Sequence, residues 1–334
     1  MKTTNRNIVF TLIIAVIFLM TACGGEDAPK TDDGNQTTAK QVQTENDQAQ
    51  GETTAASETT VAEEAPSNLA MEIAAKTRED KDNSAVLSVD GLTIEPTVLF
   101  EKDNVKVNAV ELIRDEYGEL GLNVHITNNS DKDITVDCPQ LSVNGYMITN
   151  LFSAGVRAGQ ESDESIIFLN DIMLNYGMPI TTVGEIELSF AVRDQSNYNE
   201  LFVTEPITIK TSKFDATAKP NFDDGSVIFE RDGFKIIALN LYEYEDGNCE
   251  CIVMHIENNS DQDADVYCSD LVVNDYTLSP YFTSKLPKGK MVIATIDVFE
   301  VEQKAETISI EFEFNEMNSF NAFLKTKALA LKVK

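Results

Sequence analysis

Apolar and polar residues alternate along several segments of the chain from about residue 97 onward. Every second residue is apolar in segments 120–127 (LGLNVHIT), 185–192 (EIELSFAV) and 307–314 (TISIEFEF). The apolar positions concerned are Leu120, Leu122, Val124, Ile126, Ile186, Leu188, Phe190, Val192, Ile308, Ile310, Phe312 and Phe314. Successive side chains of a strand point to opposite faces of a sheet, so a period of two predicts half-buried β-strands.

Turn signals separate the predicted strands. Asn144-Gly145 in the sequence VNGY predicts a tight hairpin, and Asn274-Asp275 stands at the matching place later in the chain. Strands of this length between turns, within about 110 residues, are typical of an antiparallel β-sandwich. We expect a short helical interruption at 170–178 and a second short helix at 68–80.

The chain contains an internal repeat. VLFEKDNVKV (98–107) matches VIFERDGFKI (227–236), and HITNNSDKDITVDC (125–138) matches HIENNSDQDADVYC (255–268). The separation of matching residues changes from 129 (98 to 227) to 130 (125 to 255) and then to 122 (190 to 312), as expected when insertions fall in loops. We therefore predict two tandem Ig-like antiparallel β-sandwich domains, at 85–213 and 217–334, called repeat 1 and repeat 2 below.

The N-terminus has the layout of an export signal. Lys2 and Arg6 precede an apolar run from Ile8 to Met20, which is short for a membrane span. Residues 20–23 (Met-Thr-Ala-Cys) resemble the bacterial lipobox, in which signal peptidase cuts before a lipidated cysteine. The resemblance implies that residues 1–22 are a lipoprotein signal peptide and that Cys23 carries acyl chains, such as palmitate, that anchor the protein to a membrane. A plain secreted protein is the alternative.

Residues 23–84 form a polar segment of low complexity. Thr, Glu, Gln, Asp and Ala dominate, and residues 24–83 contain no aromatic side chain. Such a segment buries too little apolar area to offset the entropy lost on ordering. We predict a lipidated cysteine followed by a disordered acidic tether.

The net charge of −30 argues against anionic binding partners. Nucleic-acid binding needs a basic surface, and none is visible in the sequence. The same acidity repels anionic lipid headgroups, so contact with a membrane is expected through the lipid anchor alone.

The order of the motifs is similar to that of a known group of proteins. Both repeats contain F-E-x-D-x-x-K-[VI], then I-x-N-N-S-D-x-D, then V-N-x-Y, then a glycine turn and an alternating strand. This order resembles the Ig-like or telokin-like domains of predicted lipoproteins from Gram-positive bacteria, mostly clostridial, over 97–212 and 225–334. The resemblance implies the sandwich fold and a location on the outer face of the cell membrane. It implies no activity, because the motifs are structural.

The acidic phrase that occurs in both repeats has two interpretations. Asp131 and Asp133, like Asp261 and Asp263, have the D-x-D spacing of calcium loops. An EF-hand loop also needs a central glycine and a glutamate at its twelfth position, which are absent. Asn and Asp favour turns, so we predict a hairpin turn, with weak calcium binding as the alternative.

The cysteines divide between two strand faces. Cys138 and Cys268 alternate with apolar residues and are predicted to be buried in the core. Cys249, Cys251 and His255 share the opposite face of the preceding strand. We expect free thiols; the alternatives are a disulfide from Cys251, or from Cys249, to Cys268 and a zinc site built on Cys249, Cys251 and His255. His255 and its repeat 1 counterpart His125 are predicted to face solvent.

Motifs of catalysis are missing from the sequence. It has no Gly-x-Ser-x-Gly, no glycine-rich phosphate loop and no His-Glu-x-x-His. We therefore expect no enzyme activity and no cofactor. The expected function is that of a membrane-anchored extracytoplasmic lipoprotein whose domains are non-catalytic binding modules for another envelope protein or a wall component. A structural or spacer lipoprotein and, less favoured, a hydrolase are the alternatives.

Overall fold

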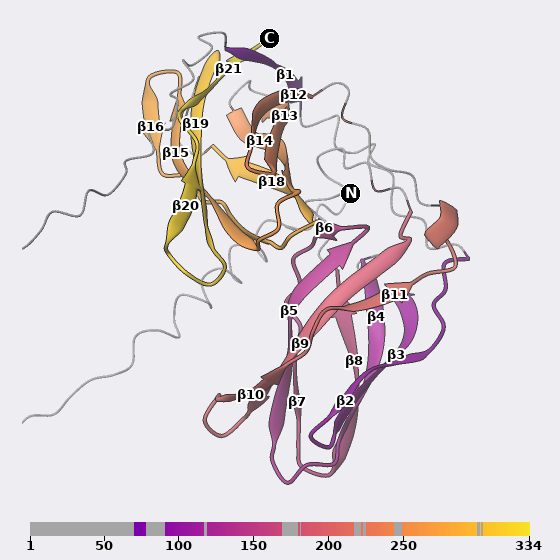
Figure 1. The fold of residues 1–334 in the computed structure, drawn as a ribbon. Helices are drawn as coiled ribbons and strands as arrows, with labels where there is room; N and C mark the ends of the chain where they lie inside the picture. Colours follow the sequence, from indigo (N-terminus) through magenta and orange to yellow (C-terminus); the bar gives the residue numbers. More distant parts are fainter. Residues whose placement is uncertain are drawn as a thin grey trace, which may run out of the picture. The chain divides into compact units, whose positions relative to one another are not determined.

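The computed structural model describes residues 70–334, except for 78–90, 117–118, 169–179, 181, 217–221, 223–224, 244–248, 299–300 and 302. Residues 65–334 group into one compact unit. Within the residues just named, its elements are β-strands and one 3-10 turn, η2 (Phe214–Ala216), and nearly all strand pairs are antiparallel. The predicted all-β sandwich fold is confirmed (Figure 1). The helix expected at 170–178 lies outside the described residues.

Repeat 1 consists of two sheets. The first has the order β2-β3-β4-β8, and the second is built on β5 and β9, with β6 and β7 pairing to β5 and with β10 and β11 pairing to β9. The strands are β2 (Thr97–Lys102), β3 (Val105–Arg114), β4 (Leu120–Asn128), β5 (Ile134–Val143), β6 (Tyr146–Met147), β7 (Ser153–Val156), β8 (Gln160–Ile167), β9 (Glu185–Asp194), β10 (Glu200–Val203) and β11 (Ile207–Lys210).

Repeat 2 has the same set of pairings. β12, β13, β14 and β18 correspond to the first sheet, and β15 and β19 organise the second. The strands are β12 (Ser226–Arg231), β13 (Phe234–Glu243), β14 (Cys249–Asn258), β15 (Ala264–Val273), β16 (Tyr276–Leu278), β17 (Thr283–Leu286), β18 (Met291–Asp297), β19 (Thr307–Glu316), β20 (Ala322–Lys325) and β21 (Leu329–Val333). The repetition seen in the sequence is therefore a repetition of strand pairing.

The alternating segments fill the space between the sheets. All twelve apolar positions predicted to face inward are buried, and they belong to two hydrophobic clusters, one for each repeat. The predicted hairpin after β5 is also confirmed. Asn144 and Gly145 have φ angles of 50° and 83°, and two positive φ angles are what a type I′ turn requires.

The repeated acidic phrase connects the two sheets. β4 pairs with β3 and β8, whereas β5 belongs to the other sheet, and β14 and β15 are separated in the same way. The prediction of a hairpin at this place is therefore wrong. Asn and Asp signal that the chain turns, but they do not determine whether the next strand pairs with the one before it or crosses to the opposite sheet.

Residues Met71–Thr77 form strand β1, which pairs with β13 and β21 of repeat 2. The helix expected at 68–80 is therefore wrong, and this part of the predicted tether is ordered. Short local sequence favoured a helix, but tertiary pairing with two strands overrides that preference.

Candidate functional site

The outer face of sheet β13-β14-β18 differs from the matching face of repeat 1. In repeat 2, Tyr242, Cys251, Val253 and Ile293 are buried and belong to the same hydrophobic cluster as the core of repeat 1. The counterpart of Val253 is Asn123, which is partly exposed and accepts a hydrogen bond from Ser165. Apolar side chains thus make this face of repeat 2 an intramolecular contact surface, called the junction below.

Backbone and charged groups also join the repeats at the junction. The Met291 N–H donates to the Gly145 carbonyl at 2.9 Å, where β18 meets β6. Beside it, the Lys290 ammonium lies 2.7 Å from a Glu187 carboxylate oxygen. These two side chains are only 14% and 24% exposed, so the pair is partly shielded from water and salt. The two repeats are therefore linked by apolar packing, a backbone bond and an ion pair.

His255 lies at the centre of the junction. Its imidazole stacks on Phe222, with 4.0 Å between ring centroids, and lies 5.6 Å from the ring of Tyr146. In the described part of the chain, neither ring nitrogen has a hydrogen-bond partner. The Glu257 carboxylate oxygen is 3.5 Å from Nδ1, but without hydrogen-bond geometry. Burial lowers the pKa of His255 to about 4, against the opposing effect of Glu257.

The prediction that His255 faces solvent is wrong, since the residue is 1% exposed. Its counterpart His125 is partly exposed, and its Nδ1 lies 2.7 Å from Asp163. The strand pattern placed both histidines correctly on the outer face of their sheet. It could not show that repeat 1 and Phe222 cover that face in repeat 2.

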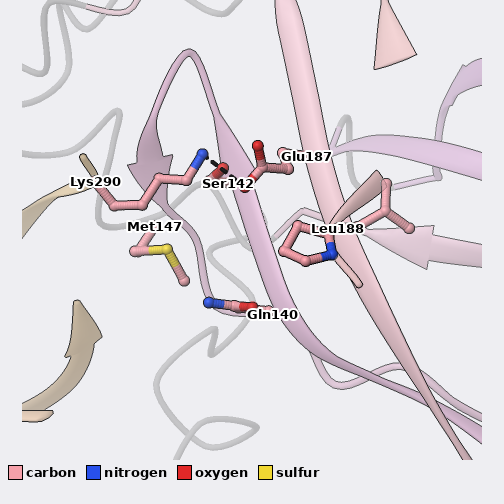
Figure 2. A pocket seen from close by; sticks show the side chains of 7 residues that line it. Gln140, Ser142, Met147, Glu187, Leu188 and Lys290 are labelled. Carbon is pink, nitrogen blue, oxygen red and sulfur yellow. Dashed lines mark ion pairs between the residues drawn. The ribbon is translucent and has the colours of Figure 1, made fainter. Parts of the chain in front are cut away.

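A shallow hollow lies beside the ion pair (Figure 2). Its volume is about 160 Å³, part of it open solvent, and its lining comes from both repeats. The lining residues are Gln140, Ser142, Met147, Glu187, Leu188, Pro206 and Lys290. Pockets for small molecules measure about 300–1,000 Å³, so this hollow is too small to enclose such a ligand.

The cysteine positions exclude one of the predicted alternatives. Cys251 lies in the cluster at the junction, whereas Cys268 is a free thiol in the core of repeat 2. The structure forms no Cys251–Cys268 disulfide, because the two residues lie on opposite sides of sheet β13-β14-β18. Within the described residues, no group of three His, Cys, Asp or Glu side chains is placed to hold a metal ion. The side chain of Cys249 lies outside the described residues, as does the predicted lipidation site Cys23.

Cys138 and Cys268 are buried in the cores of their repeats, as predicted. Their thiols face the Gln140 and Asp270 carbonyls, at 3.3 and 3.6 Å. Burial raises the pKa of both thiols to about 12. Both residues therefore act as small core side chains and not as nucleophiles.

The acidic phrase uses its polar atoms internally. Asn128 is fully buried; its amide donates to the Lys132 and Val156 carbonyls, and its oxygen accepts from Ser130. Val156 belongs to β7, so the Asn128 side chain links the end of β4 to the other sheet. Asp133 accepts the backbone N–H of Ala158. Repeat 2 has the same bonds at Asn258, Ser260 and Asp263. The arrangement explains the repeated phrase as a structural turn.

Exposed apolar side chains occur at equivalent hairpins of the two repeats. Tyr198, in the β9–β10 loop, is 74% exposed, and Phe320, in the β19–β20 loop, is 91% exposed. Leu201 and Phe323 follow them three positions later and are also exposed. We call these four residues the hairpin tips. The sequence aligns them, but only the structure shows that they are solvent-exposed.

No family model matches the chain, and no curated protein is similar to it. A search of the described ranges for a helix suited to crossing the bilayer found none.

Proposed function

We propose that the chain is a lipid-anchored extracytoplasmic lipoprotein that acts as a non-catalytic binding protein of the cell envelope of a Gram-positive bacterium. The leader and the lipobox-like residues ending at Cys23 support export and anchoring. The partner is another envelope protein or a wall component, met through the two repeats.

The hairpin tips carry the binding part of the proposal. A turn between two strands needs no large apolar side chain, and four exposed ones at equivalent places have a cost in solubility. Aromatic side chains supply large, rigid contact areas at binding surfaces. Their presence in both repeats, in the loop of a hairpin or at the start of the strand that follows it, fits a twofold contact with one partner.

The anchor is tested by cell fractionation of the Cys23→Ala chain. The wild-type protein is expected in the membrane fraction, and the variant in the medium. Membrane retention of the variant would contradict lipid anchoring at this residue.

The tips are tested with the full chain carrying Tyr198→Ser and Phe320→Ser together. Sedimentation with purified cell walls, and cross-linking to envelope proteins on intact cells, are compared for this variant and for the wild type. Tyr281→Ser is the matched control, since Tyr281 is 81% exposed but lies outside both hairpins. Loss of capture in the double variant alone is expected; equal capture by all three chains would rule out the tips.

A spacer role is the second candidate, and the junction favours it. Apolar packing and the Lys290–Glu187 pair fasten the repeats to each other. Such fastening suits a protein that holds a partner at a defined distance from the membrane. A chain whose tips are dispensable, but whose envelope phenotype depends on Lys290, would fit this role better.

A further inference from the structure

Repeat 2 takes a strand from the part of the chain that precedes repeat 1. Met71–Ile73 of β1 lie parallel to Leu331–Val333 of β21, and Ala74–Thr77 lie parallel to Asn240–Glu243 of β13. The Ser226 hydroxyl donates to the Glu72 carbonyl at 3.0 Å, although these residues are 154 positions apart. β1 therefore joins the two sheets of repeat 2 along one edge, which we call the seam.

Repeat 1 fills the same place with its own residues. Leu92 and Ile94, directly before β2, are buried in its core, and Ile94 bridges to Thr211 just after β11. In repeat 2, Phe222 stands before β12, but it stacks on His255 at the junction. The residue that enters the core at the seam is instead Ile73, which is 2% exposed.

The seam holds β1 by backbone pairing, one buried side chain and one ion pair. Backbone pairing to two strands holds the segment extended, and the Lys334 N–H donates to the Ile73 carbonyl at 3.0 Å. One side chain, Ile73, is buried, whereas Met71, Glu72 and Ala74 are exposed. Glu72 forms an ion pair with Lys334. A strand with one aliphatic anchor and a neighbouring carboxylate meets all of these requirements, as in other cases of strand addition.

We propose that the seam of repeat 2 is a strand-accepting groove that also binds β1 of a second copy of this chain. β1 provides all of its contacts to repeat 2 by itself, so the same segment from another molecule makes the same pairings, the same ion pair and the same burial of Ile73. When two copies exchange β1, each groove makes the contacts that it already makes within one chain, so no new interface has to form. The fraction of exchanged chains depends on protein concentration. The result is a chain-to-chain link through an edge strand.

The register of β1 against β21 places two exposed residues opposite each other, and a disulfide between them can test the proposal. Glu72 and Lys332 lie opposite each other and are both exposed. One full-length chain carries Glu72→Cys. The second carries Lys332→Cys together with Ile73→Asp, which removes its own β1 from the groove because a buried carboxylate is unfavourable. The two are mixed under mild oxidation, and disulfides are mapped by mass spectrometry.

We expect a disulfide between residue 72 of one chain and residue 332 of the other. Adding Ile73→Asp to the chain that carries Glu72→Cys should reduce the yield of this disulfide by more than about tenfold, as expected for loss of one buried aliphatic anchor. Ala322→Cys on β20, exposed but away from the seam, replaces Lys332→Cys as the control and should give no such product. Absence of the 72–332 product would overturn the proposal.

A fluorescent peptide of residues 68–80 provides a second readout that does not depend on cysteines. The peptide should bind the full-length Ile73→Asp chain saturably, and a peptide carrying the same substitution should not. Circular dichroism of the Ile73→Asp chain checks that its strands are retained. Peptide binding without the chain-to-chain disulfide would overturn the second copy as the partner, and failure of both measurements would overturn the groove.

Discussion

The imidazole of His255 stacks on the ring of Phe222 with an interplanar angle of 26°, in a buried site where repeat 1 covers repeat 2. The ring is neutral near pH 7, because burial lowers its pKa from 6.5 to about 4. Below pH 6.5 the imidazole of His255 is protonated in the unfolded chain, whereas in the folded chain it stays neutral down to about pH 4. The stability that the neutral ring provides is complete above pH 6.5 and is lost as the pH falls toward 4.

We therefore predict that His255→Phe changes the pH dependence of unfolding. Phenylalanine keeps the aromatic stacking but cannot be protonated. Between pH 7 and pH 4, wild type should lose about 3 kcal/mol of unfolding free energy relative to the variant. Urea denaturation across this range measures the difference. His125→Phe, at the partly exposed counterpart, should change it less, and parallel curves for wild type and His255→Phe would contradict the prediction.

The buried turn asparagines should be important for stability. Asn128→Ala removes the hydrogen bonds from this side chain to the Lys132 and Val156 carbonyls and from the Ser130 N–H to its amide oxygen. The expected loss of unfolding free energy is about 2–3 kcal/mol, with a similar loss for Asn258→Ala. Asn129→Ala is the neighbouring exposed control and should stay within about 0.5 kcal/mol of wild type. Equal denaturation midpoints for Asn128→Ala and Asn129→Ala would show that the side-chain bonds contribute little.

The Lys290–Glu187 pair should contribute more than an exposed pair. Lys290→Met leaves a partly buried carboxylate without its partner, so we expect a loss of about 1–2 kcal/mol, partly recovered when Glu187→Gln is added. Lys325→Met removes the exposed Lys325–Glu313 pair and should cost less than about 1 kcal/mol. A double-mutant cycle at both pairs measures the coupling energies; similar values would mean that the junction does not shield its ion pair.

Cys138 and Cys268 should resist alkylation in the folded protein. Raising a thiol pKa from 9.0 to about 12 reduces the thiolate fraction at pH 8 roughly a thousandfold. Timed iodoacetamide labelling with peptide mapping should show slow modification of both residues in buffer and rapid modification in guanidinium chloride. Rapid labelling of the folded chain would indicate that the cores open readily.

Local patterns are sufficient to predict much of this fold. Alternation in segments such as 185–192 predicts strand and buried face together, because a strand has only two faces and water selects between them. Asn144-Gly145 predicts its hairpin, because few residue pairs adopt two positive φ angles. The repeat predicts that both halves share one set of pairings.

Other features depend on contacts between distant parts of the chain. The turn after β4 crosses to the other sheet because Asn128 bonds to β7, and no local signal distinguishes this from a hairpin. β1 is a strand because repeat 2 has an unfilled seam, whereas its own residues favour helix. The hairpin tips match in sequence, but their exposure is a property of the folded surface.

The two histidines show where local sequence patterns stop predicting the structure of this chain. The sequence determined their equivalent places, on the outer face of matching strands, because strand periodicity and duplication are local properties. The tertiary structure decided their environments: His125 pairs with Asp163 near water, and His255 is enclosed by Phe222 and Tyr146. The physical reason is that burial depends on what covers a sheet face, and the covering residues here come from a different repeat and from the segment that links the two.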